Sequence, residues 1–159
     1  MTLPSLTNYQ LEDFLRKQDI PVQVISKDEI TSKPHRGTYI VNLEDSDDPR
    51  GGSHWCLATI TPLPLSVRGR KRAMIWFDSF GADMPEVVRT WMKSSGLPCY
   101  YSNQQVQAID ASSCGFWCML VEMMSSKGIK FADILATFST STEENERKLS
   151  HFFKRSKIV

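Results

Sequence analysis

The sequence predicts an α+β fold in which a mixed, mostly antiparallel sheet packs against helices. Short segments rich in β-branched and aromatic residues fill the first half and are bounded by Pro, Gly or Asp, which is typical of strands. Longer apolar stretches in the second half have helical spacing and end near glycine. The chain has 159 residues, of which 41% are hydrophobic. Because this suffices for one core and is short for two ordinary domains, we expect a single domain over 1–159.

A short helix is expected first, because Thr7 and Gln10 have the spacing of a capping box and apolar residues follow at helical intervals before Pro21. Four strands with turn-forming residues at their boundaries should follow: 22–25, 38–41, 54–60 and 73–77. The segment 66–72 would then be the hairpin tip that joins the last two strands.

The rest of the chain is mainly helical in this prediction, with one further strand from Cys99 towards Val106. The stretch from Cys114 is strongly apolar and stops at Gly128, as a buried helix does. The helices expected in this part of the chain are 84–95, 114–127, 131–138 and 142–153.

The sequence argues against a membrane-spanning protein, a secreted protein and a disulfide-stabilised protein. No apolar run approaches the roughly 18 residues of a membrane span, and the first ten residues lack a signal-peptide pattern. We therefore expect an intracellular protein without a membrane anchor or secretion signal. The four cysteines do not resemble a disulfide framework, so reduced thiols are expected: Cys56, Cys99, Cys114 and Cys118.

Three residues have the chemistry of a cysteine nucleophile, its base and an orienting carboxylate. Cys114 follows the polar turn 110–113 and begins the apolar helix, so unpaired N–H groups and the helix dipole favour its thiolate. His54 opens one expected strand and Asp78 closes the next, which places both at one rim of the sheet. We expect Asp78 to accept the Nδ1 proton of His54 and Nε2 to face Cys114. Gln107 and the Cys114 backbone N–H could stabilise an oxyanion.

These residues lie in three short motifs, Gly51-Gly52-Ser53-His54-Trp55, Phe77-Asp78-Ser79-Phe80-Gly81, and Val106-Gln107 followed by Ser113-Cys114-Gly115. The motifs resemble the His-Trp, acidic-Pro-Phe-Gly and Gln…Cys-Gly motifs of the adenain-type viral cysteine proteases, and more distantly the proteases that process ubiquitin-like modifiers. The resemblance extends from about Asn8 to Gly128. It implies a papain-like, adenain-like fold with His54 as base, Asp78 as orienter, Cys114 as nucleophile and Gln107 as oxyanion donor. Two departures are Asp78, where adenain has Glu, and Ser79 in place of Pro.

The resemblance also implies a substrate class. Adenain-type proteases cut viral precursor proteins, such as capsid and core proteins, after small residues, commonly Gly, during virion maturation. We therefore expect a viral enzyme, from a small DNA virus or a virophage, that acts as a monomer in the host cell and is packaged in the virion. Gly52 and Trp55 are expected to line a narrow substrate channel, and Gly115 to leave room for the substrate backbone.

The same resemblance suggests partners, although the chemistry itself requires no cofactor. Cys99 lies near the position at which adenain forms a disulfide with an activating peptide. DNA is a cofactor of that protease, and the expected hairpin tip supplies basic residues that could contact nucleic acid: Arg68, Arg70, Lys71 and Arg72.

Other interpretations of these residues stay open. Cys114 and His54 could be core or strand-end residues, and Gln107 a surface amide. Cys56 and Cys118 are interpreted as core thiols, and no metal site is expected because the zinc-knuckle spacing is absent. The alternative functions are a deconjugating protease for ubiquitin-like modifiers and a nucleic-acid-binding module that acts through the basic runs.

Overall fold

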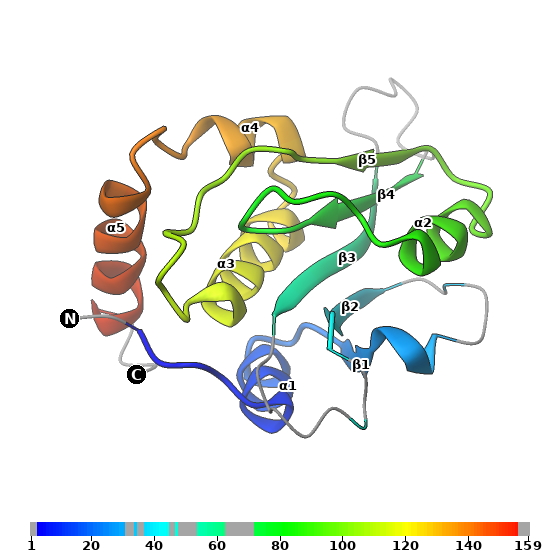
Figure 1. Ribbon diagram of the computed structural model, residues 1–159, viewed down its shortest axis with the longest axis horizontal. Helices are drawn as coiled ribbons and strands as arrows, with labels where there is room; N and C mark the ends of the chain where they lie inside the picture. Colours follow the sequence, from blue (N-terminus) through cyan, green and yellow to red (C-terminus); the bar gives the residue numbers. More distant parts are fainter. Residues whose placement is uncertain are drawn as a thin grey trace.

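The computed structural model describes residues 3–30, 34, 37–44, 47, 54–62 and 72–155. Its centre is a sheet with the strand order β1-β2-β3-β4-β5 (Figure 1). The strands are β1 (Val22–Ser26), β2 (Thr38–Asn42), β3 (Trp55–Pro62), β4 (Arg72–Phe77) and β5 (Cys99–Tyr101). The two central pairings are antiparallel and the pairings at both edges are parallel. The α+β class and the mixed sheet are thus confirmed, but antiparallel pairing is confined to the centre.

Helices cover both faces of this sheet. A core cluster on one face includes residues of α1 (Asn8–Lys17), α3 (Cys114–Ser126), α4 (Phe131–Ala136) and α5 (Thr142–Arg155). A second cluster on the other face includes three residues of α2 (Glu86–Lys93). A 3₁₀ turn, η1 (Lys27–Glu29), follows β1. The arrangement is a sheet between two helical layers (Figure 1).

Both faces of the central strands are therefore buried. Neighbouring residues of β3 alternate between the two clusters, with Trp55 and Leu57 in the first and Cys56 and Ala58 in the second. This alternation decides which residues near the start of β3 share a face. His54, immediately before β3, is two residues from Cys56, so their side chains project to the same side.

Several predicted helix boundaries are confirmed. Thr7 caps α1 in a capping box, with the Thr7 N–H donating to Gln10 Oε1 at 2.8 Å and the Gln10 N–H donating to Thr7 Oγ1 at 3.2 Å. Helix α3 begins at Cys114 and is followed by Gly128, whose φ of 86° lies in the left-handed region that ends helices. The nucleophile candidate is thus the first residue of a buried helix.

Strand β5 is shorter than predicted. Pairing stops at Tyr101, and the chain then turns towards the loop after β4, where the N–H groups of Val106 and Gln107 both donate to the Ser79 carbonyl, at 2.9 and 3.0 Å. These bonds give the two backbone N–H groups an acceptor without extending the sheet. They also bring two of the three sequence motifs together.

Two further predictions concern the hairpin tip and membrane-spanning helices. The predicted hairpin tip lies outside the described residues, apart from Arg72 at the start of β4. Within the described part of the chain, the helices are too short or too polar to cross a bilayer.

Candidate active site

Helix α3 is fixed on the beginning of β3 by two sulfur contacts. The Trp55 N–H donates to Cys114 Sγ at 3.4 Å, and the Cys118 thiol, one turn later, donates to the Trp55 carbonyl at 3.3 Å. Because His54 precedes Trp55, these contacts bring the Cys114 sulfur to the histidine. Cys114 is buried and Cys118 fully so. Cys118, like Cys56, is the core thiol that the sequence predicts.

The end of β4 supplies the carboxylate. The antiparallel register pairs Leu57 with Phe77, so Asp78, next after Phe77, lies beside the start of β3. His54 Nε2 and Asp78 Oδ1 are 2.7 Å apart, and the Phe80 N–H donates to the same oxygen at 2.8 Å. Asp78 is buried, with 1% of its surface exposed, so water competes little for these bonds.

The turn after Asp78 covers the histidine. The Phe80 ring lies over the His54 ring, with centroids 4.8 Å apart and planes inclined by 31°. Gly81 has φ 67°, and a Cβ at this position would lie 2.6 Å from the Asn103 carbonyl oxygen. Only glycine fits this turn without moving the 102–107 segment. The glycine of the second motif is thus required by a turn that holds both Asp78 and Phe80.

The two ring nitrogens of His54 have exchanged roles relative to the prediction. Nε2, not Nδ1, contacts Asp78, which leaves Nδ1 for the hydrogen bond between His54 and Cys114. The reason is the placement of the partners: the carboxylate comes from the neighbouring strand β4 and the thiol from α3. The predicted orientation of the ring is therefore wrong, although the order thiol, imidazole, carboxylate is the predicted one.

His54 carries a raised pKa. Burial alone lowers it, but hydrogen bonds to Asp78 and Cys114, together with their negative charges, outweigh the burial and raise the pKa of His54 from 6.5 to about 9. An imidazolium is thus favoured at neutral pH. Such a cation next to Cys114 is the partner that a thiolate requires.

Gln107 is buried and held at both ends of its amide. Its Oε1 accepts a hydrogen bond from the Ser79 hydroxyl at 2.5 Å, and its Nε2 donates to the Ala111 carbonyl at 2.8 Å. The interpretation of Gln107 as a surface amide is wrong. Since a side-chain amide has two N–H groups, one remains beyond the bond to Ala111.

Trp55 and Gly115, two predicted substrate contacts, pack against the N-terminal segment. Trp55 is 5% exposed, belongs to the core, and its indole N–H donates to the Leu6 carbonyl at 3.0 Å. A Cβ on Gly115 would lie 3.2 to 3.3 Å from side-chain atoms of Leu6 and Leu11. The missing side chain leaves room for the N-terminal segment.

Of the other predicted site residues, the structure describes Cys99 and Arg72. Cys99 is exposed on the edge strand β5. Gly52, Arg68, Arg70 and Lys71 lie outside the described residues, and Arg72 begins β4.

Cys56 is a neighbour of the site that sequence reasoning assigned to the core alone. Its sulfur, a nitrogen of His54 and a carboxylate oxygen of Asp78 all lie within 4.8 Å of one another. Burial, followed by the nearby charges, raises the pKa of Cys56 well above its ordinary value, so it is a neutral thiol. The spacing of residues 54 and 56 in the sequence was the signal for this proximity.

The distance between His54 and Asp78 can be compared with that expected in a zinc site. Two ligands of one zinc ion are separated by about 3.3 Å, whereas Nε2 and Oδ1 are 2.7 Å apart. The arrangement is that of a hydrogen-bonded pair.

Comparisons with known proteins were made with the sequence and with the structure. No family model and no curated protein matches the sequence. Two crystal structures of the ASFV pS273R protease match the structure, one with a TM-score of 0.62 and 14% identity over 89% of this chain, the other with a TM-score of 0.58 and 14% identity over 92%. The chain has the fold of that protease. It spans 64% and 67% of the length of the two protease chains, or about two thirds.

Proposed function

We propose that the chain is a cysteine endopeptidase with Cys114 as nucleophile. The observation that carries the proposal is the convergence of a thiol, an imidazole and a carboxylate from α3, the start of β3 and the end of β4. A buried cysteine by itself would be an ordinary core residue. A buried cysteine at a helix start, hydrogen-bonded to a histidine that is oriented by a buried carboxylate, has the geometry of nucleophilic catalysis. The likeness to the fold of a viral protease supports the same reaction class.

In the proposed reaction His54 and Cys114 form an imidazolium–thiolate pair. The thiolate attacks the scissile carbonyl carbon, and the imidazolium donates its Nδ1 proton to the leaving amine. Water, deprotonated by His54, then hydrolyses the thioester. Asp78 orients the ring through Nε2 and stabilises its positive charge during the first half of the cycle.

The oxyanion of the tetrahedral intermediate needs donors fixed in advance. We assign this role to the second N–H of the Gln107 amide and to the backbone N–H of Cys114. The bonds of Gln107 to Ser79 and Ala111 support this assignment, because they hold the amide in one orientation before substrate arrives.

For the substrate we propose viral precursor proteins cut after small residues, commonly Gly. The support is the resemblance of the three motifs to those of adenain-type proteases together with the fold of the ASFV pS273R protease. A maturation protease should recognise a short extended segment around the cut, so short peptides suffice as substrates. A deconjugating protease takes much of its binding energy from the folded modifier, and truncation to the tail should abolish most of its activity.

The test compares peptides that have a hydrophobic residue upstream of Gly, structural precursor proteins encoded with this chain, and ubiquitin-like fusions. We expect cleavage of peptides and precursor by the unaltered protein and by Cys99→Ser, and none by Cys114→Ala. Efficient cleavage of folded fusions with negligible turnover of peptides would overturn the maturation role. Cleavage by Cys114→Ala at the rate of the unaltered protein would overturn the proposed enzyme altogether.

A further inference from the structure

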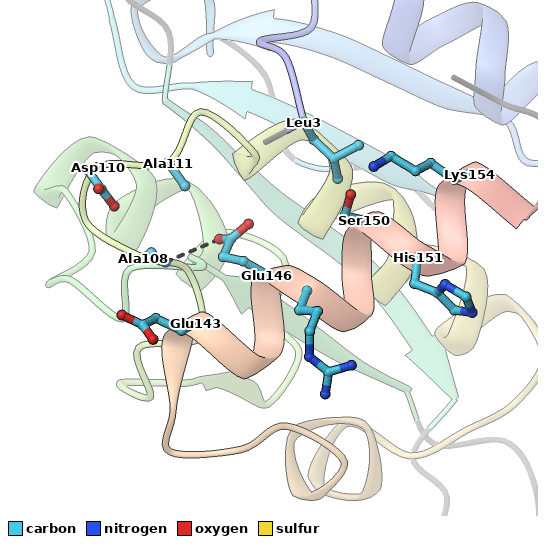
Figure 2. Close-up of a pocket in the computed structure, with 10 residues that line it drawn as sticks. Leu3, Ala108, Asp110, Ala111, Glu143, Glu146, Ser150, His151 and Lys154 are labelled. Atoms are coloured by element: carbon cyan, nitrogen blue, oxygen red, sulfur yellow. Dashed lines mark hydrogen bonds between the residues drawn. The ribbon is translucent and has the colours of Figure 1, made fainter. Parts of the chain in front are cut away.

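Helix α5 contacts the segment before the nucleophile through one carboxylate, that of Glu146. Figure 2 shows Glu146 directed from α5 towards the 108–111 loop, and its Oε1 accepts the Ala108 N–H at 3.1 Å. The Ser113 hydroxyl donates to Glu146 and lies 2.8 Å from each carboxylate oxygen. The indole N–H of Trp117 contacts Oε1 at 3.2 Å. One side chain thus holds both ends of the segment that connects Gln107 to Cys114, and the first turn of α3 as well.

Two of these three partners, Ala108 and Ser113, lie next to a residue of the proposed mechanism. Ala108 follows Gln107, and Ser113 precedes Cys114. Within the same segment the Gln107 amide donates to the Ala111 carbonyl, so the position of the 108–111 turn decides where the amide points. A displacement of the turn would therefore move Gln107.

Ser113 would ordinarily be expected to cap α3. Serine at an N-cap accepts a bond from an N–H of the first helical turn, but Ser113 makes no such side-chain bond. Its hydroxyl donates to Glu146 instead. The start of the nucleophile helix is therefore oriented from outside the helix, by a residue of α5.

The neighbouring residue strengthens the attachment. Asn145 is buried, and its amide donates to the Val106 carbonyl at 3.2 Å and to the Ser139 carbonyl at 2.8 Å. Helix α5 therefore contacts the loop on both sides of Gln107. Glu146 itself is partly exposed and lines an open groove of about 490 Å³ whose lining includes neither His54 nor Cys114.

We propose that Glu146 is a positioning residue for the oxyanion site, acting through the 108–113 loop on Gln107 and on the start of α3. The inference rests on the proposed protease function and adds a residue that acts without contacting substrate. Donors aimed at an oxyanion lose most of their effect when displaced, and the loss of one such donor typically lowers kcat by about 10²–10³-fold. Glu146→Gln keeps the size of the side chain, removes the negative charge that strengthens these hydrogen bonds, and leaves one acceptor oxygen in place of two.

The experiment measures three quantities on the unaltered protein, Glu146→Gln and the matched control Glu143→Gln. Glu143 lines the same groove one turn earlier on α5, is exposed, and lies outside the proposed machinery (Figure 2). The quantities are kcat and KM for a Gly-containing peptide, the rate of Cys114 alkylation by iodoacetamide, and Tm. Alkylation forms no oxyanion, whereas peptide hydrolysis does, so the two rates separate oxyanion positioning from thiolate formation.

For Glu146→Gln we expect kcat to fall about 10–100-fold, with KM within about threefold and the alkylation rate within about twofold of the unaltered protein. Glu143→Gln should match the unaltered protein in all three. Ser113→Ala, which removes one hydroxyl only, should show the same pattern to a smaller degree and serves if Glu146→Gln does not fold.

Unchanged kcat in Glu146→Gln and Ser113→Ala would overturn the inference while leaving the protease function intact. An alkylation rate that falls in proportion to kcat would do the same. Absence of cleavage by the unaltered protein would overturn both.

Discussion

Replacing Asp78 with Asn should shift the pH dependence of catalysis as well as its rate. The substitution keeps the shape of the side chain but removes the charge 2.7 Å from His54 Nε2. The pKa of His54 is raised from 6.5 to about 9, which corresponds to about 3 kcal/mol at 1.36 kcal/mol per pKa unit. Burial acts in the opposite direction, so the favourable interactions with Asp78 and Cys114 together exceed this amount.

Among the interactions that raise the pKa of His54, the hydrogen bond to Asp78 is the largest, and the negative charge of Asp78 raises it further. An opposite charge at this distance typically shifts a pKa by about 1–3 units, so Asp78→Asn should lower the pKa of His54 by at least about 1. Because the imidazolium is the active form, activity is present below the pKa of His54 and is lost as pH rises through it. The basic limb of kcat/KM should lie near pH 9 in the unaltered protein and about one pH unit lower, or more, in the variant.

The assay is peptide hydrolysis between pH 5 and 10, with Asp83→Asn as the control. Asp83 is exposed and lies in the same connection between β4 and α2, so its substitution removes the same charge without touching His54. We expect kcat to fall by about 10²–10⁴-fold in Asp78→Asn and to stay within twofold in Asp83→Asn. Asp78→Glu should be milder, because it keeps a carboxylate. A basic limb that stays near pH 9 in Asp78→Asn would refute the assignment of Asp78 as the orienting group.

Two further predictions concern stability. Glu122 is buried on α3 beside Thr38, whose hydroxyl donates to its Oε1 at 2.6 Å, and burial raises its pKa from 4.5 to about 7. The folded state therefore keeps a proton that the unfolded state releases, so stability should fall by up to about 3 kcal/mol between pH 4.5 and 7. Urea unfolding at pH 5 and pH 8 should show a larger loss for the unaltered protein than for Glu122→Gln, in which only the loss that comes from His54 remains; equal losses in both would contradict it. Gly81→Ala should destabilise by about 1–3 kcal/mol more than Gly96→Ala, because both have positive φ but only at Gly81 would a Cβ meet backbone, at 2.6 Å. Equal urea midpoints for the two variants would refute the close approach.

The sequence was sufficient for those features that depend on neighbouring residues. Thr7 and Gln10 define the start of α1, and Gly128 the end of α3, through local backbone geometry. The three motifs identified His54, Asp78 and Cys114, which the structure brings together. The hairpin order of β3 and β4 explains why His54 and Asp78 meet, since the end of one strand lies beside the start of the other.

Features that depend on contacts between distant segments could not be predicted. The nitrogen of His54 that faces Asp78 depends on the side-chain rotation that α3 and β4 impose together. Trp55 and Gly115 belong to the core because the N-terminal segment around Leu6 covers them, which periodicity does not reveal. Glu146 is 33 residues from Ser113 in the chain, and nothing in its helical surroundings marks it as different from other acidic residues of α5.

The most direct test of the central claim is the site of reaction with a Gly-terminated peptide chloromethyl ketone, mapped by mass spectrometry. Cys99 provides an internal competitor, because it is exposed while Cys114 is 5% exposed. Accessibility alone would direct the reagent to Cys99, and burial keeps the pKa of Cys56 and Cys118 well above the ordinary value, so they should not react. The account predicts a single adduct on Cys114, with loss of all peptidase activity and no such adduct in His54→Ala. Modification of Cys99 with Cys114 unmodified, or full activity after complete modification of Cys114, would contradict it.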